Sequence, residues 1–366
     1  MGKTAYQELT SRFEGSGGLP LPPGKNEPLT EWFKYWLTEQ EAEFLLDLPM
    51  QHEMPATLSA IAEKAGMTEA DTGEMLETLA EKVMIYDMKM PTEEGEIRLF
   101  VLTEIFFFLE SYLNRYYDDH LNDPDDIHAN LGRWFEDLKS SEKMEPKAKE
   151  MRIIPIAKAV EDPRGPVSTY DAIKLVEKTA YVGVLKCLCR STGHLAGTPC
   201  EYPLEVCIVL GEHARRYQER GFGREVTKEW AIETIKKCEE MGLCHSVDNV
   251  DDDGDASIIC NCCPCHCIPL TGYKMADQAA RMARSEFVNT VDLDECAGSG
   301  ECVEACSYGA LELVDDRASV KEDRCIGCGV CCTVCPTKAL SLRARPMEER
   351  DKIYPTAEQY MAAMAE

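Results

Sequence analysis

Cysteine is concentrated in one half of this chain, in spacings that suit ligation. The sequence has 366 residues and nineteen cysteines, and all nineteen follow residue 186. Five of them fall within eight residues, in the run I-C-N-C-C-P-C-H-C-I from Ile259 to Ile268. Disulfide scaffolds are small and spread their cysteines along the chain. A cysteine-free half beside a crowded half therefore indicates sulfur used locally, as a metal ligand.

The last part of the crowded half contains an internal repeat. Shifting the sequence by 29 residues superimposes three pairs of cysteines: Cys296 on Cys325, Cys302 on Cys331 and Cys306 on Cys335. The second copy, R-C-I-G-C-G-V-C-C-T-V-C-P, is a C-x2-C-x2-C-x3-C-P run. In such a run three thiolates surround one face of a [4Fe–4S] cube and the fourth reaches another cube. A zinc site would instead be expected to show two C-x2-C pairs.

This segment resembles the bacterial two-cluster ferredoxins over about 60 of the 366 residues. By position, the resemblance implies that one [4Fe–4S] cluster is bound by Cys306, Cys325, Cys328 and Cys331. It implies that the other is bound by Cys296, Cys302 and Cys335, with Ser299 where a fourth cysteine is expected.

The serine departs from the ferredoxin pattern, because a hydroxyl is a much poorer iron ligand than a thiolate. Three outcomes stay open: a [3Fe–4S] centre, a cube completed by Ser299 or water, or no cluster. We expect a cluster, since three of its cysteines are present. The additional Cys332 is expected to pack rather than to ligate.

Eleven further cysteines lie upstream of the repeat, and nine of them fall in two cysteine-rich stretches. These nine are Cys187, Cys189, Cys200, Cys207, Cys260, Cys262, Cys263, Cys265 and Cys267. Nine sulfurs are about what two four-thiolate cubes require. The side chains of the adjacent Cys262 and Cys263 diverge, which favours their serving different clusters. The opening run is therefore predicted to form a wall shared by two metal centres.

The C-x-C-R and C-N-C-C-x-C patterns resemble an iron–sulfur protein family of anaerobic metabolism, the 4Fe–4S binding proteins, over residues 150–345. The resemblance implies electron transfer. The alternative is a zinc-knotted domain, because cysteine and histidine together suit zinc and both His245 and His266 are nearby. Cysteine far outnumbers histidine, which favours iron. Arg190 is expected to offset cluster charge, and Cys238 and Cys244 are expected to be buried packing residues.

The cysteine-free half has a different pattern. Residues 1–27 are rich in glycine and proline and are expected to be extended or poorly ordered. Helix, helix, helix and hairpin follow over about residues 29–110, which resembles a winged helix-turn-helix. The helix in the recognition position, T-E-A-D-T-G-E-M-L-E-T-L-A-E-K, carries five acids and one lysine. DNA phosphates would repel such a helix, so a docking or dimerising module is favoured.

These patterns predict a multidomain α+β protein. The expected parts are a flexible segment at 1–27, a winged-helix-like docking domain with a helical extension at 28–150, a cysteine-rich iron–sulfur α/β domain at 151–285, a two-cluster ferredoxin domain at 286–345 and a tail at 346–366. The chain has no apolar run of membrane-spanning length and no export signal, so a cytoplasmic location is expected, where thiols stay reduced. The net charge of −27 disfavours nucleic acid and anionic lipid as partners.

The function expected is electron transfer through two to four [4Fe–4S] clusters, one of which could be [3Fe–4S]. The protein would be a relay subunit of a larger anaerobic oxidoreductase, with redox proteins as partners and possible self-association through the N-terminal domain. No flavin, nicotinamide or nucleotide motif is present, which places substrate chemistry elsewhere. Two alternatives stay open: a redox-sensing winged-helix regulator, and an enzyme acting at an open cluster iron.

Overall fold

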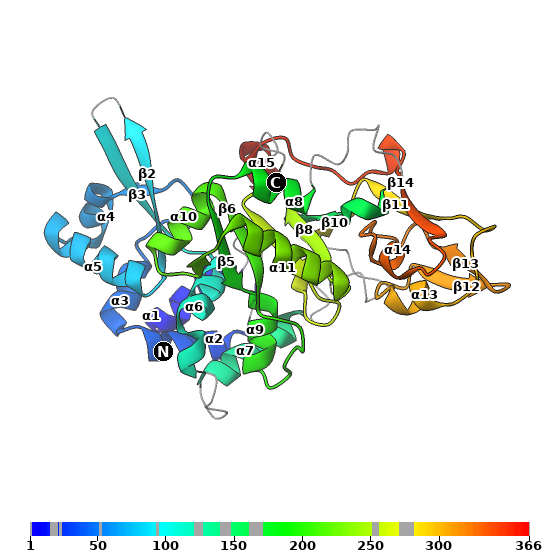
Figure 1. Cartoon of the computed structure of the whole chain (residues 1–366). Coiled ribbons are helices and arrows are strands. Elements are labelled where there is room, and N and C mark those ends of the chain that lie inside the picture. The colour runs from blue at the N-terminus through cyan, green and yellow to red at the C-terminus, as the bar shows by residue number, and fades with distance from the viewer. Residues whose placement is uncertain are drawn as a thin grey trace. The chain divides into compact units, whose positions relative to one another are not determined.

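The computed structural model describes residues 2–14, 21, 24–50, 53–92, 95–120, 127–139, 148–160, 171–250, 256–270 and 282–365. Helices and strands occur in both halves, so the chain is an α+β protein, as expected (Figure 1). Apart from the last two residues, the chain divides into two compact units. The first comprises Met1–Met144 and Ser191–Pro199, and the second comprises Glu145–Arg190 and Cys200–Met364. None of the helices in the described residues has the length and apolar character that crossing a bilayer requires.

The first unit consists of helices and one small sheet. Its elements are α1 (Ala5–Phe13), α2 (Glu27–Trp36), α3 (Glu39–Leu45), β1 (Ala56–Thr57), α4 (Leu58–Ala65), α5 (Glu69–Glu81), β2 (Ile85–Thr92), β3 (Gly95–Leu102), α6 (Ile105–His120) and α7 (Ile127–Lys139). The strands form an antiparallel sheet in the order β1-β3-β2. Thr38, Thr57 and Thr68 each cap the helix that follows by accepting a backbone N–H bond. Three helices and a hairpin are present within residues 29–110, where the sequence predicts them.

The beginning of the chain differs from the expected extended segment. Residues Ala5–Phe13 form a helix, and the Thr4 and Gln7 side chains cap its first turn reciprocally. Leu9 and Phe13 are buried, and the Phe13 ring stacks on Phe33. Most of the glycines and prolines of this segment follow the helix. Most of the residues in that stretch lie outside the described residues. The prediction overlooked a capping box in a segment judged by its composition.

A seven-stranded sheet forms the centre of the second unit. Its strands are β4 (Met151–Ile154), β5 (Val182–Lys186), β6 (Glu205–Leu210), β7 (Arg224–Glu225), β8 (Cys244–Asp248), β9 (Ile258–Cys262) and β10 (Met282–Ala283). They lie in the order β10-β4-β8-β9-β6-β5-β7. The helices between them are α8 (Ala172–Lys178), α9 (Leu188–Leu195), α10 (Gly211–Glu219) and α11 (Lys228–Glu240).

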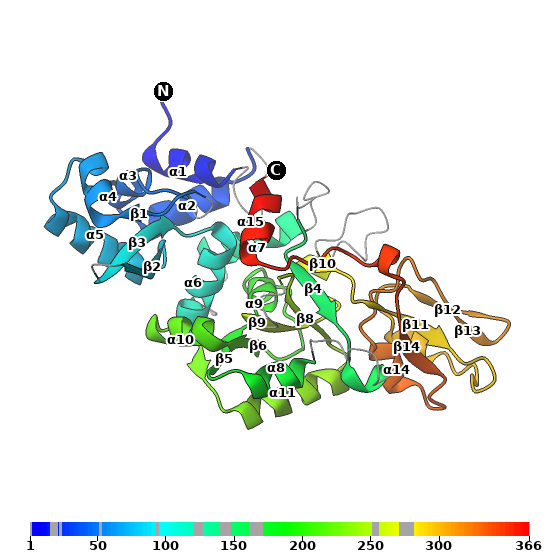
Figure 2. The ribbon, with the colours of Figure 1, turned by 90° about the horizontal axis from the view of Figure 1, so that it is seen from above.

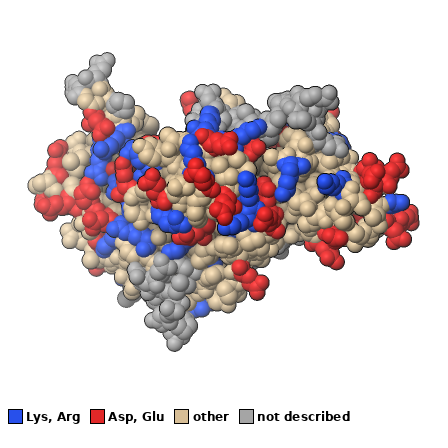
Figure 3. Space-filling view, viewed as in Figure 1, with Lys and Arg blue, Asp and Glu red and all other residues tan. Residues whose placement is uncertain are grey.

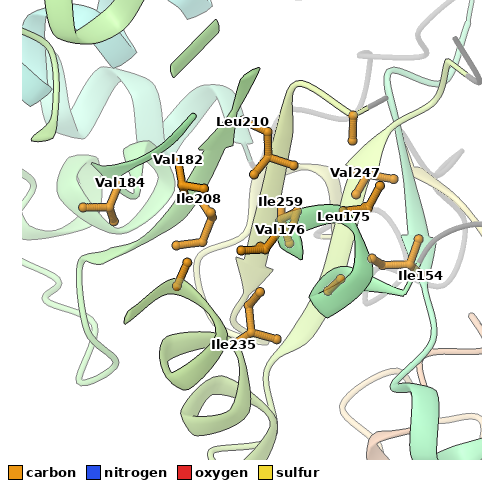
Figure 4. Close-up of a cluster of buried hydrophobic side chains, with 13 residues drawn as sticks. Ile154, Leu175, Val176, Val182, Val184, Ile208, Leu210, Ile235, Val247 and Ile259 are labelled. Atoms are coloured by element: carbon orange, nitrogen blue, oxygen red, sulfur yellow. The ribbon is translucent and has the colours of Figure 1, made fainter. Parts of the chain in front are cut away.

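The two faces of this sheet have different contents. Helices α8 and α11 lie side by side along one face (Figure 2), where Val176 and Ile235 pack on Val184, Ile208 and Ile259 (Figure 4). Because side chains alternate along a strand, the neighbours of these apolar residues point to the opposite face. The residues placed there include four cysteines: Cys207, Cys244, Cys260 and Cys262. The alternation therefore gives the sheet one apolar face and one sulfur-rich face.

The two repeat copies follow the sheet in the chain. Strands β11 (Phe287–Val291) and β14 (Leu340–Ala344) pair as an antiparallel ribbon, and β12 (Leu311–Val314) and β13 (Arg317–Val320) form a hairpin. Helices α13 (Glu301–Ala305) and α14 (Val330–Val334) follow the two glycine-rich cysteine loops and contact each other. The chain ends with η2 (Met347–Glu349) and α15 (Ala357–Ala365).

The repeats and the sheet belong to one compact unit, although the sequence suggests separate domains. The backbone N–H of Ile156 donates to the carbonyl of Cys328 at 3.0 Å, and that of Ser285 donates to Ile326 at 3.0 Å. Gly329 packs against η1 (Ala157–Ala159), where a Cβ atom added to the glycine would lie 2.7 Å from the Ala159 Cβ atom. The boundary expected near residue 285 is thus bridged by backbone contacts.

Gly329→Ala is expected to loosen this packing, and Gly300→Ala provides the matched control. The two glycines are equivalent in the repeat and have φ angles of +82° and +81°. At Gly300 the nearest neighbour of an added Cβ atom is the Leu313 Cδ1 atom at 3.7 Å. Both alanines share the left-handed backbone strain, so Gly329→Ala should cost about 1–3 kcal/mol more through overpacking alone. Thermal denaturation of the anaerobic protein measures this difference, and equal losses in the two variants would contradict it.

Candidate iron–sulfur centres

All nineteen cysteines are free thiols, which removes the disulfide interpretation. Eight of them belong to the repeat, and six of these eight line two pockets. Cys306, Cys328 and Cys331 line a pocket of about 300 Å³, together with Cys244 and Tyr308.

Backbone and amide N–H groups point at the sulfurs around this pocket. The Ala310 N–H donates to the Cys306 Sγ atom at 3.3 Å, and Asn289 donates through its backbone to Cys325 at 3.5 Å and through Nδ2 to Cys331 at 3.2 Å. Hydrogen bonds of this kind favour the charged form of a sulfur ligand. The four positions that the ferredoxin resemblance assigns to one cluster therefore share an environment suited to thiolates.

The second pocket of the repeat has a volume of about 310 Å³. Its lining includes Ser299, the serine that replaces a cysteine of the ferredoxin pattern. Cys296, Cys302 and Cys335 line it, and Ser299 lies in its wall. The Ala318 N–H donates to the Cys296 Sγ atom at 3.4 Å. Gly298 and Gly300 adopt positive φ angles on either side of Ser299, which turns the loop around the pocket. Ser299 thus lines the same pocket as the three cysteines.

Ser299→Cys is expected to add one iron to this site if it holds a three-iron centre. A thiolate at residue 299 would supply the missing corner ligand of a cube. Electron paramagnetic resonance of the oxidised, anaerobic protein would then lose a three-iron signal, and the reduced protein would gain a four-iron one. A spectrum unchanged by the substitution would show that the corner is already complete or that the site holds no cluster.

Six of the nine upstream cysteines form a closed ring of thiol contacts on the sulfur-rich face of the sheet. In ring order they are Cys187, Cys189, Cys267, Cys262, Cys260 and Cys207. The hydrogen bonds from Cys260 and Cys267 lower the pKa of Cys262, while the pKa values of Cys260 and Cys267 are raised. Cys187 directly follows β5, and Cys189 lies at the start of α9. Cys207 lies on β6, Cys260 and Cys262 lie on β9, and Cys267 follows β9. The ring has two sulfurs more than the four that a cube takes.

Three other upstream cysteines gather with one histidine in a second group. Cys200, Cys263, Cys265 and His266 place one ligand atom each within 4.8 Å of one another. Partial desolvation and the charge of Cys263 raise the pKa of the Cys265 thiol to about 12, so a bound cation must displace its proton at neutral pH. Cys262 and Cys263 lie in different groups, as expected from their diverging side chains. His245 is not in this group, and its Nδ1 atom donates to the Asn261 Oδ1 atom at 2.7 Å.

Residues 295–339 match the family described as the 4Fe-4S dicluster domain. This part of the chain is a ferredoxin-like iron–sulfur domain. No curated protein and no solved structure matches the chain. The match covers both cysteine loops of the repeat. It begins at residue 295, and the upstream cysteines, which precede it in the chain, therefore lie outside the matched domain.

Arg190 is a buried cation that interacts with both upstream thiol groups, so its surroundings indicate whether these groups suit anionic metal centres. It is fully buried, donates to the carbonyl oxygens of Pro203 and Asn261, and hydrogen-bonds to Cys263. Burial alone would lower its pKa, but the charges of Cys187 and Cys263 raise it above the usual value. A buried guanidinium is costly unless anions compensate its charge, and thiolates bound to metal supply such charge. The charge of Arg190 therefore fits metal-bound thiolates on both sides.

Cys244 joins the ferredoxin-like domain to the ring, a role that differs from the simple packing expected for it. Its Sγ atom lies 3.3 Å from the Tyr308 hydroxyl and hydrogen-bonds to Cys328. Across the β8–β9 pairing, Cys244 lies directly opposite Cys262. Cys238, in contrast, packs with Leu243 among buried side chains.

Sequence reasoning missed Cys244, Tyr308 and Asn289 as neighbours of the expected ligands. The alternation on β8 could have indicated Cys244, because Cys244 and Ser246 fall on the face opposite Val247. No local signal marks Asn289 or Tyr308. Their positions depend on how the β11–β14 ribbon and the sheet meet.

Proposed function

We propose that this protein is a multi-cluster electron relay in which the ferredoxin-like domain and the ring of six thiols exchange electrons. When bound, an iron–sulfur cluster accepts and releases single electrons at a potential set by its ligands and surroundings. In the ferredoxin-like domain, Cys306, Cys325, Cys328 and Cys331 would hold one cluster. Cys296, Cys302 and Cys335 would hold the other, with Ser299 at its open corner. Four of the six ring thiols would hold a third.

The observation that carries this proposal is the sulfur contact at Cys244. Its side chain touches Cys328, an expected ligand in the ferredoxin-like domain, and lies opposite Cys262, a member of the ring. It is almost fully buried, so water is largely excluded between the two sites. Cys244 and Cys262 also belong to the same buried cluster, so the route between the two sites would run through packed protein, which is suited to carrying electrons between metal centres.

Iron and acid-labile sulfide analysis of anaerobically purified protein tests the cluster count. About seven or eight irons per chain would confine clusters to the ferredoxin-like domain, about twelve would add one cube at the ring, and about sixteen would add another. Reductive titration with dithionite should then take up about one electron per cluster. Colourless protein without labile sulfide would end the proposal.

Cys244→Ala is expected to slow electron passage between the ferredoxin-like domain and the ring without removing iron. The change deletes the sulfur that touches Cys328 and leaves every proposed ligand in place. Rapid mixing with a reductant, followed by freeze-quench paramagnetic resonance, would report how fast each centre is reduced. Cys238→Ala is the matched control, since it removes a buried thiol of α11 that forms no hydrogen bond with Cys328 or with a ring thiol in the described residues. Equal rates in the two variants would argue against the path.

For the first unit we propose a winged-helix-like docking module rather than a DNA reader. The order helix, strand, helix, helix, hairpin over α3 to β3 supports the resemblance. The acids of α5 are exposed, and Figure 3 shows acidic side chains gathered over this helix. Such a face repels phosphates and suits a basic partner surface. A mobility-shift assay at low salt tests this, and binding to DNA would favour the redox-sensing regulator instead.

An oxidoreductase subunit also needs a surface for its redox partner. Leu313 and Val314 on β12 are exposed by 42% and 49%, and Asp315 and Asp316 follow at the hairpin tip. Leu313 also lines the pocket of Ser299. We assign this hairpin to contact with a redox protein that presents a basic rim around an apolar centre. A Leu313→Ser and Asp316→Ser double variant should weaken that contact and leave the iron content unchanged.

A further inference from the structure

The group formed by Cys200, Cys263, Cys265 and His266 brings four possible ligand atoms close together. The Cys200 Sγ atom lies 3.4 Å from that of Cys265 and 3.9 Å from that of Cys263. All four ligand atoms lie within 4.8 Å of one another.

These separations match a single tetrahedral ion. With metal–sulfur bonds of about 2.3 Å, the sulfur atoms of a tetrahedral site lie about 3.8 Å apart, which is the edge of that tetrahedron. The two measured sulfur–sulfur distances fall on either side of this value. A [4Fe–4S] cube of the ferredoxin type takes four thiolates, whereas this group offers three thiolates and one imidazole.

The surroundings also suit one divalent ion. Three thiolates and a neutral imidazole around a divalent cation carry a net charge of −1, and Arg190 hydrogen-bonds to Cys263 from the buried side. The backbone N–H of His266 donates to the Cys263 Sγ atom at 3.4 Å, which orients that ligand. Leu243 packs with Cys200 and Cys263 and provides an apolar wall.

We propose that Cys200, Cys263, Cys265 and His266 bind one structural zinc ion. Four protein ligands close the coordination sphere, which is typical of structural rather than catalytic zinc. The ion would tie the run that follows β9 to the loop before β6. It would thereby fix Cys260, Cys262 and Cys267 of the ring in place. The proposal goes beyond electron transfer, and it assigns to zinc three cysteines that the sequence places among cluster ligands.

Element-specific measurements on the full, anaerobically purified chain test the zinc site. We expect about one zinc per chain beside the iron, and zinc-edge X-ray absorption should show three sulfur ligands at about 2.3 Å and one nitrogen at about 2.0–2.1 Å. A chain with about sixteen irons and no zinc would overturn the inference and leave the relay standing. Zinc whose amount rises as iron falls between preparations would also overturn it, because the ion would then be filling empty cluster sites.

Single substitutions separate the zinc from the clusters. Cys265→Ser and His266→Ala should each lose zinc on dialysis against a chelator that leaves the unaltered protein loaded, with labile sulfide unchanged. Cys265 is exposed, so its replacement by serine is the variant least expected to disturb folding. His213→Ala on α10 is the control, since the charged groups nearest to it are Asp248, Arg216 and Glu212 rather than thiols. Loss of about four irons in Cys265→Ser would contradict the proposal and restore a cluster at this group.

Discussion

Cys331→Ser is expected to remove a whole cluster, about four irons per chain, whereas Cys332→Ser should remove none. The two residues are adjacent on α14, and both receive a hydrogen bond from the Asn289 Nδ2 atom. Only Cys331 lines the pocket shared with Cys306 and Cys328. A serine oxygen binds iron far more weakly than a thiolate does, so the site would lose its cluster rather than rearrange.

Iron and labile-sulfide analysis of the two variants, purified together without air, measures this difference. The visible absorbance that arises from the clusters should fall in Cys331→Ser by the contribution of one cluster. It should stay unchanged in Cys332→Ser. Similar iron loss in both variants would mean that Cys332 is itself a ligand. Full iron retention in Cys331→Ser would show that the ferredoxin assignment by position is wrong for this loop.

Arg190→Met is expected to destabilise the second unit more than any surface substitution. The guanidinium is fully buried, donates to two carbonyl oxygens and hydrogen-bonds to the Cys263 thiol. Removing one partner of a buried charged network costs about 3–5 kcal/mol, because the remaining charge is left uncompensated. Arg190→Lys should lose less, since it keeps the charge but cannot reach both carbonyl oxygens with a planar fork.

The control for this substitution is Arg224→Met. Arg224 also pairs with a partner within the second unit, the Glu205 carboxylate at 2.8 Å, but both side chains are nearly half exposed. Exposed pairs of this kind contribute about 0–1 kcal/mol. Because a protein with bound clusters does not unfold in one step, the measurement is the rate of iron loss in denaturant together with the thermal midpoint. Matching losses in Arg190→Met and Arg224→Met would show that the buried cation compensates no metal-bound thiolate.

Local sequence predicts much of this protein because local contacts form those parts. The capped helices α4 and α5 depend on threonine side chains three residues from the N–H groups they satisfy. The ferredoxin-like domain depends on cysteines spaced within single loops, so the spacing alone indicates the cluster type. The helix at Ala5–Phe13 was missed because the prediction for residues 1–27 relied on overall composition, which the glycines and prolines after the helix dominate, and not on local contacts.

The division of the upstream cysteines was decided by the tertiary structure. Cys207 and Cys260 meet because β6 pairs with β9, and Cys244 faces Cys262 because β8 pairs with β9. These partners are separated by roughly twenty to fifty residues along the chain, and no local spacing encodes which strand lies beside which.

The sequence by itself predicted that sulfur in the second half holds metal, and it predicted which cysteines of each ferredoxin loop would be ligands. Only the tertiary structure decided that Cys262 joins a ring of six thiols while its neighbour Cys263 joins a tight group with His266. The physical reason is the alternation of side chains at the end of β9. Consecutive residues there point to opposite sides, and the strands and loops that meet each side come from distant parts of the chain.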